Sequence, residues 1–173
     1  MNKSVRTRSM QESDIERVAE IHVAAWHNAY VGIVRQERID SLSVTTSMKT
    51  WRRRFREQDT RHMVCEWDGE LVGFASYGPA RVVRGGPAGP GLAEIYAFYV
   101  HPERWRLGCG RTLLNAVIAR LHGEWEAIVL WTLEQSSEAR AFYASAGFQE
   151  VQNSSRPHAN LGADVLLYRL SLV

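Results

Sequence analysis

The sequence is poor in the residues on which disulfide-rich and membrane-spanning proteins depend. It contains only two cysteines, Cys65 and Cys109, so we expect no disulfide framework. No apolar run approaches the ~20 residues that a membrane-spanning helix needs, and the first residues lack the apolar core of a signal peptide. These absences favour a cytoplasmic protein that does not span a membrane.

A large excess of charge is also missing. The net charge of +2 is too small to indicate binding to nucleic acid or to a membrane surface, although it is compatible with a small anionic ligand. His62 and Cys65 are three residues apart in a strand-like segment and would face opposite sides, and we expect no metal site. The length of 173 residues and the apolar fraction of 45% fit one globular domain, residues 1–173.

The spacing of apolar residues predicts an alternation of strands and helices. Asp68 and Gly69 suit the type I′ turn of a hairpin, and residues 82–91, rich in glycine and proline, should form a loop. The order of elements predicts an α/β fold with a mixed sheet of about seven strands flanked by about four helices. We expect strands at residues 5–9, 62–67, 70–77, 94–100, 127–132, 148–153 and 165–172, and helices at residues 13–29, 44–58, 108–123 and 136–146.

A run of basic residues lies in the second expected helix. Residues 49–56 contain one lysine and four arginines. A solvated helix face is the simpler interpretation of such a run. The alternative is a landing site for an acidic substrate or for the phosphates of a cofactor.

The most informative segment is a strand that leads into a glycine-containing loop and then into a helix. Gly108 and Gly110 allow the backbone to approach a ligand closely. The start of a helix presents free N–H groups and the positive end of the helix dipole, which together suit a phosphate. Positive charge around this junction comes from Arg104, Arg106 and Arg111.

Other phosphate-binding loops fit this segment less well. A P-loop needs a lysine after its last glycine, and none follows Gly110. A dinucleotide-binding fingerprint needs a third glycine where Leu113 stands. An ordinary strand–loop–helix turn is the remaining alternative.

Residues 105–110, WRLGCG, resemble motif A of the GCN5-related N-acetyltransferase (GNAT) superfamily, whose pattern is [QR]-x-x-G-x-[GA]. The chain departs from it with Trp105 in the Gln/Arg position and Arg106 where a glycine is often found. The resemblance implies an acyltransferase with acetyl-CoA as donor, whose pyrophosphate is held by the amides of residues 106–111 and whose pantetheine pairs with the backbone of residues 98–100. The cofactor-binding residues that it implies are Phe98, Tyr99, Val100, Trp105, Arg106, Leu107, Gly108, Cys109, Gly110, Arg111 and Ser136.

Residues 133–148 resemble motif B of the same family, N-x-x-A-x-x-F-Y-x-x-x-G-F, with Ser136 in the Asn position. Tyr143 matches the tyrosine that protonates the departing CoA thiolate in the family. A phenol with a pKa near 10 is a suitable proton donor for a leaving thiolate. The alternative for Tyr143 is a core aromatic, because it shares an apolar helical face with Phe142.

Glu94 is the candidate general base. An ammonium has no lone pair, so a carboxylate near the acceptor, directly or through water, could remove its proton. Glu94 opens the strand that leads into motif A, and the histone-acetylating branch of the family has a glutamate at the same spacing. The alternative is a strand-end carboxylate bound to solvent or to an arginine.

The resemblance also implies where the acceptor binds. It places Trp26, Tyr30 and Tyr77 at the acceptor site, with residues 153–162 closing over the top. The acceptor would be a small-molecule or peptide amine that attacks the thioester directly in a ternary complex, with backbone N–H groups near residues 98–100 stabilising the oxyanion. The pantetheine should enter where strands 94–100 and 127–132 diverge.

Two other functions stay open, and so does the oligomeric state. The chain could bind acetyl-CoA without turning it over, as a sensor or interaction module, because both motifs carry substitutions. It could also acetylate an aminoacyl-tRNA, for which the basic residues 49–56 are the only support. Residues 165–172, read as an edge strand, are compatible with a homodimer.

Overall fold

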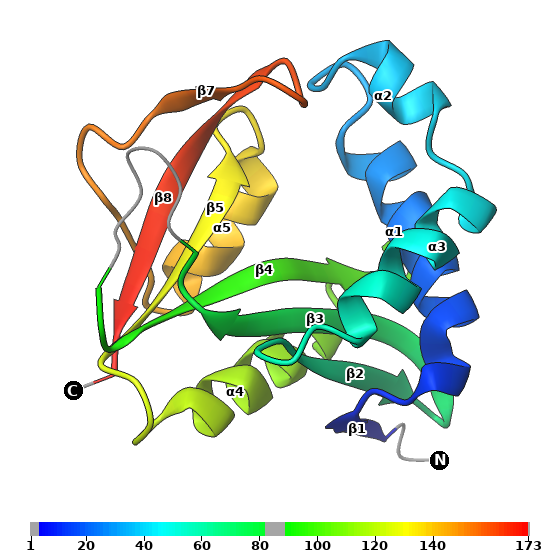
Figure 1. Cartoon of the computed structure of the whole chain (residues 1–173), viewed down its shortest axis with the longest axis horizontal. Coiled ribbons are helices and arrows are strands. Elements are labelled where there is room, and N and C mark those ends of the chain that lie inside the picture. Colours follow the sequence, from blue (N-terminus) through cyan, green and yellow to red (C-terminus); the bar gives the residue numbers. More distant parts are fainter. Residues whose placement is uncertain (1–3, 82–88, 173) are drawn as a thin grey trace.

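A single mixed sheet organises the molecule in the computed structural model, which describes residues 4–81 and 89–172 (Figure 1). In the described part of the chain the sheet has eight strands in the order β1-β2-β3-β4-β5-β8-β6, and β7 pairs with β8. The β4–β5 pair is parallel and the other pairs are antiparallel. The strands are β1 (Val5–Ser9), β2 (Arg61–Trp67), β3 (Glu70–Pro79), β4 (Leu92–Val100), β5 (Ala127–Leu133), β6 (Gln149–Glu150), β7 (Arg156–His158) and β8 (Ala163–Ser171).

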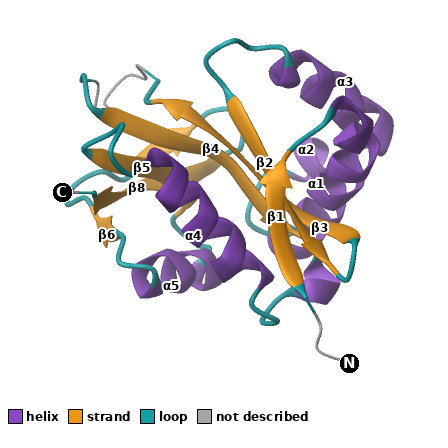
Figure 2. Cartoon of the chain, turned by 90° about the horizontal axis from the view of Figure 1, so that it is seen from below, coloured by secondary structure: helices purple, strands orange, loops and turns teal. Residues whose placement is uncertain are grey.

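Helices cover both faces of the sheet, as Figures 1 and 2 show. One core lies between the sheet and α1 and α3, around Trp51 and Phe74. A second lies between the sheet and α4 and α5, around Leu113 and Ile128, and a third lies around Trp26 and Val165. The helices are α1 (Ile15–Ala29), α2 (Gln36–Asp40), α3 (Val44–Phe55), α4 (Cys109–Leu121) and α5 (Ser137–Ser145).

The α/β fold and the order of its long elements are as the sequence predicts. Asp68 and Gly69 join β2 to β3 with φ values of 50° and 85°, the left-handed conformations that a type I′ turn requires. The structure adds α2 and β7 to the predicted elements. These are five and three residues long, too short for a hydrophobic period to reveal them. Most of the predicted loop at residues 82–91 lies outside the described residues.

The prediction of an edge strand at residues 165–172 is wrong. The corresponding strand β8 pairs with β5 along one side and with β6 and β7 along the other. Its backbone groups are therefore already bonded on both sides, and this argument for a homodimer no longer applies. The error arose because β6 and β7 are too short to be placed outside β8 from sequence.

The predicted divergence of β4 and β5 is confirmed. The two strands pair only from Leu92 and Ala127 to Ile95 and Leu130. Beyond Ile95, β4 stays paired with β3 up to Val100, but its edge toward β5 is open. A bulge in the β3–β4 ladder leaves Tyr96 with no residue opposite it in the pairing register of β3. This bulge lies at the point where β4 and β5 separate.

Candidate active site

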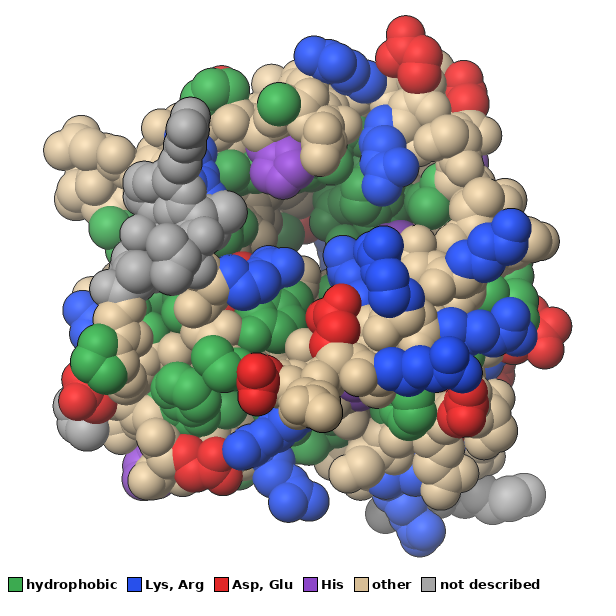
Figure 3. Space-filling model, viewed as in Figure 1, with side chains coloured by type: hydrophobic (Ala, Val, Ile, Leu, Met, Phe, Trp, Pro, Cys, Tyr) green, Lys and Arg blue, Asp and Glu red, His purple; other side chains and the backbone are tan. Residues whose placement is uncertain are grey.

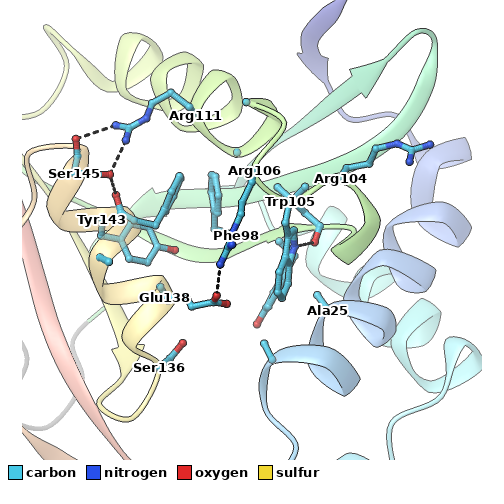
Figure 4. A pocket seen from close by; sticks show the side chains of 18 of the residues that line it. Ala25, Phe98, Arg104, Trp105, Arg106, Arg111, Ser136, Glu138, Tyr143 and Ser145 are labelled. Carbon is cyan, nitrogen blue, oxygen red and sulfur yellow. Dashed lines mark hydrogen bonds and ion pairs between the residues drawn. The ribbon is translucent and has the colours of Figure 1, made fainter. Parts of the chain in front are cut away.

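A cavity of about 570 Å³ lies where β4 and β5 separate. Its walls come from α1, the end of β4, the loop before α4, and α5 (Figure 4). A cavity of this volume is in the usual range for small-molecule sites. It brings together these residues that the resemblance implied: Phe98, Tyr99, Val100, Trp105, Arg106, Gly108, Gly110, Arg111, Ser136 and Tyr143.

Two predicted cofactor-binding residues do not line this cavity with their side chains. Leu107 is 47% exposed, and Cys109 is buried in the core beside Cys65. The Cys65 thiol lies 3.6 Å from the Cys109 carbonyl oxygen, and burial raises the pKa of both thiols. Leu107 and Cys109 could therefore contact a ligand only through their backbone amides.

The first turn of α4 offers unbonded amides. Gly108 caps the helix with φ 87°, and Arg106 also has a positive φ of 61°. The bond from the Thr112 amide to the Gly108 carbonyl, 2.9 Å, is the first of the helix. The amides of Cys109, Gly110 and Arg111 precede it and donate to no other backbone group of the described residues, so they can meet an anionic ligand at the positive end of the helix dipole.

The arginines around this turn are held by weak surface contacts. Arg106 pairs with Glu138 at 2.8 Å, and both side chains are largely exposed. Arg111 donates to the Ser145 hydroxyl at 2.6 Å (Figure 4). Exposed pairs of this kind contribute little to stability, so a phosphate could displace them at small cost.

Trp105 ties the loop to the end of β4. Its indole N–H donates to the Val100 carbonyl oxygen at 2.7 Å, and its ring forms part of the cavity wall. The tryptophan that departs from the family pattern therefore has a structural role. It fixes the loop that presents the free amides.

Tyr143 is buried, and its hydroxyl points into the cavity (Figure 4). Its ring packs against Phe98, Phe142 and Phe148. Burial, followed by the nearby Tyr99 hydroxyl, raises the pKa of the phenol above its usual value of about 10. No described residue forms a hydrogen bond with this hydroxyl, so it is a protonated donor available to a ligand.

A second group of aromatic side chains lies on the α1 side of the cavity. The Trp26 indole donates to the Tyr99 hydroxyl at 3.0 Å, and the Tyr30 ring packs edge-on against Trp26. Tyr30 and Tyr99 line the cavity, whereas Trp26 supports Tyr99 from behind. Sequence reasoning identified only the backbone of Tyr99 and missed its side chain.

The segment predicted to close over the site includes β7. In the turn after β7, the Leu161 carbonyl accepts a bond from the Arg35 amide at 2.9 Å. The turn therefore meets the start of α2 above the gap between β5 and α1 (Figure 1).

Tyr77 is not at the site. It is 3% exposed and lies in the core on the α4 face, opposite Ile95 on β4. Its predicted role in the acceptor site is wrong, because Tyr77 shares with Ala75 the side of β3 that faces α4.

Glu94 lies upstream on β4 and does not line the cavity. Its side chain is 3% exposed and forms an ion pair with Arg81, with 2.6 Å between Oε1 and Nη2. Its other oxygen, Oε2, accepts a bond from the Arg81 backbone amide at 2.9 Å. The structure therefore shows the arginine-bound carboxylate that was the alternative reading of this residue.

Within residues 4–81 and 89–172, no three histidine, cysteine or carboxylate side chains are grouped as metal ligands would be. In the same part of the chain, no helix is long and apolar enough to cross a membrane.

Comparison with known proteins gives a family and a fold. Residues 15–148 match the sequence model of the acetyltransferase (GNAT) family. The uncharacterized N-acetyltransferase YuaI of Bacillus subtilis (strain 168) is 32% identical over 139 residues, which cover 76% of this chain and 73% of that protein.

Solved structures share the fold at lower identity. The PaiA N-acetyltransferase of Thermoplasma acidophilum, in complex with coenzyme A, superposes with a TM-score of 0.75 at 21% identity, covering 97% of this chain and 99% of that one. YncA from Salmonella typhimurium, with its cofactor acetyl-CoA, has a TM-score of 0.71 at 21% identity, covering 98% and 94% of the two chains.

Proposed function

The chain belongs to the acetyltransferase (GNAT) family, and on that premise we propose that it transfers an acetyl group from acetyl-CoA to a primary amine in a ternary complex. The observation that carries the proposal is a single cavity with free helix amides on one wall and the Tyr143 hydroxyl on another. We also propose that residues 1–173 form one domain, because all three cores include residues of the same sheet.

The residues of the cavity fit the chemistry of CoA. The amides at the start of α4, with Arg106 and Arg111, would hold the pyrophosphate. The open edge of β4 has backbone groups with which the amides of pantetheine could pair as an added strand would. Phe98 and Phe142 give that passage apolar walls.

Three groups would act on the reacting atoms. An amine attacks the thioester carbonyl, and backbone N–H groups of residues 98–100 stabilise the oxyanion. Tyr143, which keeps its proton at neutral pH because burial raises its pKa, donates to the departing thiolate. Glu94, through water, accepts the proton of the amine once Arg81 no longer binds one of the two carboxylate oxygens of Glu94.

Gly110→Val should weaken acetyl-CoA binding at least about tenfold. A Cβ at Gly110 would lie 3.5 Å from the Phe142 ring, so the γ-methyl groups must enter the space of the ligand or displace that ring. Titration calorimetry with acetyl-CoA measures the change. Ala119→Val, at an exposed position of the same helix, is the matched control and should bind like the wild type.

Turnover is tested by thiol release from acetyl-CoA in the presence of a panel of amines. Release that depends on both the enzyme and an amine supports the proposal. Tight acetyl-CoA binding without release for any amine would favour the non-catalytic sensor instead.

A further inference from the structure

A second cavity, of about 520 Å³, opens next to the first along β4. It is bounded by the end of α3 and the turn after it, residues 54–60, by Ser76 on β3 and by Tyr96 on β4. Tyr96 is three residues before Tyr99, whose side chain lines the first cavity, and the bulge at Tyr96 puts both side chains on the face of the sheet that α1 and α3 cover, so the two positions are about 10 Å apart along the strand. One small molecule can therefore extend from one cavity into the other.

Arg54 is the unusual residue of this second cavity. It is half-buried in the wall, and no carboxylate of the described residues lies within ion-pair distance of it. Burial, with the like charge of Arg81, lowers the pKa of its guanidinium. The guanidinium of Arg54 lies over the ring of Trp51, with 5.1 Å between the guanidinium carbon and the ring centroid. This cation–π contact replaces only part of the hydration that the guanidinium has lost.

Ser76 lies in the wall of the same cavity. It is 1% exposed, and no described group forms a hydrogen bond with its hydroxyl. A buried hydroxyl without a partner is energetically costly. Arg54 and Ser76 therefore line one cavity as two donors for which residues 4–81 and 89–172 supply no acceptor.

Groups of both signs surround these donors. Arg81 is paired with Glu94, while Glu57 and Asp59 stand on the exposed rim. Figure 3 shows Lys and Arg side chains gathered around a hollow on this face of the molecule. A ligand that places an anion on the inner donors can thus point its amine toward the first cavity, an arrangement that suits a zwitterion.

Building on the proposed acetyl transfer, we propose that the second cavity holds an anionic group of the acceptor, a carboxylate or a phosphate, against Arg54 and Ser76. The acceptor is then an amino acid or another amine that carries such a group. A polyamine has no anion to offer, and its charge would be repelled by Arg54.

The test compares pairs of amines that differ only in the anion. L-Phenylalanine is measured against its amide, and 2-aminoethyl phosphate against ethanolamine, with spermidine as the cationic probe. We expect one of the anionic amines to exceed its neutral partner at least tenfold in kcat/KM, and the pair that shows this preference distinguishes carboxylate from phosphate. Equal rates within both pairs, or preference for spermidine, would overturn the inference while leaving acetyl transfer intact.

Arg54→Gln tests the residue itself. The KM of the preferred anionic amine should rise at least tenfold, with kcat changed less than threefold. Arg53→Gln, at the exposed neighbouring arginine of α3, should leave both constants unchanged. If none of the amines is turned over, binding of each probe to the CoA complex is followed by thermal shift. A shift with an anionic amine that Arg54→Gln abolishes supports the inference, and its absence contradicts it.

Discussion

Replacing Tyr143 by phenylalanine should lower kcat about 100-fold or more while leaving the KM for acetyl-CoA within about threefold. The change removes only the hydroxyl, so the ring contacts with Phe98, Phe142 and Phe148 remain. What is lost is the proton donor to the departing thiolate, and general acid catalysis typically contributes 10²–10⁴-fold. Steady-state thiol release measures both constants.

Tyr168→Phe is the matched control for that substitution. Tyr168 is also a buried tyrosine of the same core, but its hydroxyl bonds to Glu150 and Arg140 outside the cavity. Its loss should affect stability more than kcat. If Tyr143→Phe retains full activity, the hydroxyl has no part in the reaction and Tyr143 is a core aromatic only.

The second large effect is expected at Glu94. Glu94→Gln should lower kcat/KM for the amine about 100-fold at neutral pH. The side-chain amide of glutamine cannot accept the proton that the substrate ammonium must lose before it can attack. The deficit should shrink as the pH rises toward the pKa of the amine, near 10, where the neutral nucleophile no longer depends on a base. A pH profile of kcat/KM shows this convergence.

A purely structural role for Glu94 gives a different profile. The ion pair with Arg81 is partly buried, so its loss lowers stability whatever the chemistry. A deficit that stays constant with pH would mean that Glu94 only positions Arg81 and its strand. Glu126→Gln, at an exposed carboxylate just before β5, should have the activity of the wild type at every pH.

Most residues that the sequence assigns to the cofactor line one cavity, because the segments that carry them are local. The glycine-containing loop and the first turn of α4 are contiguous, and Tyr143 lies one motif further along the same chain. The spacing of the apolar residues and the positions of the glycines in the sequence are enough to place such elements. The divergence of β4 and β5 follows from the same two motifs.

The acceptor side depends on contacts between distant segments, and there the sequence alone falls short. Arg81 pairs with Glu94 across the edge of β3 and β4, and Arg54 and Ser76 line the same cavity only because α3 ends over β3. Tyr77 lies in the core because it faces α4, on the same side of β3 as Ala75. No local pattern encodes the pairings between distant segments, so the sequence favoured a solvated helix face for the basic run at residues 49–56 and did not single out Arg54.

Thermal unfolding with acetyl-CoA, CoA and NADH tests the central claim most directly. A ligand at about one hundred times its dissociation constant adds ~2.7 kcal/mol of stability, which raises the melting temperature by several degrees. The account predicts a rise with acetyl-CoA and with CoA, and none with NADH. No rise at millimolar acetyl-CoA would mean that the loop from Trp105 to Gly110 does not hold the cofactor, and would contradict the account.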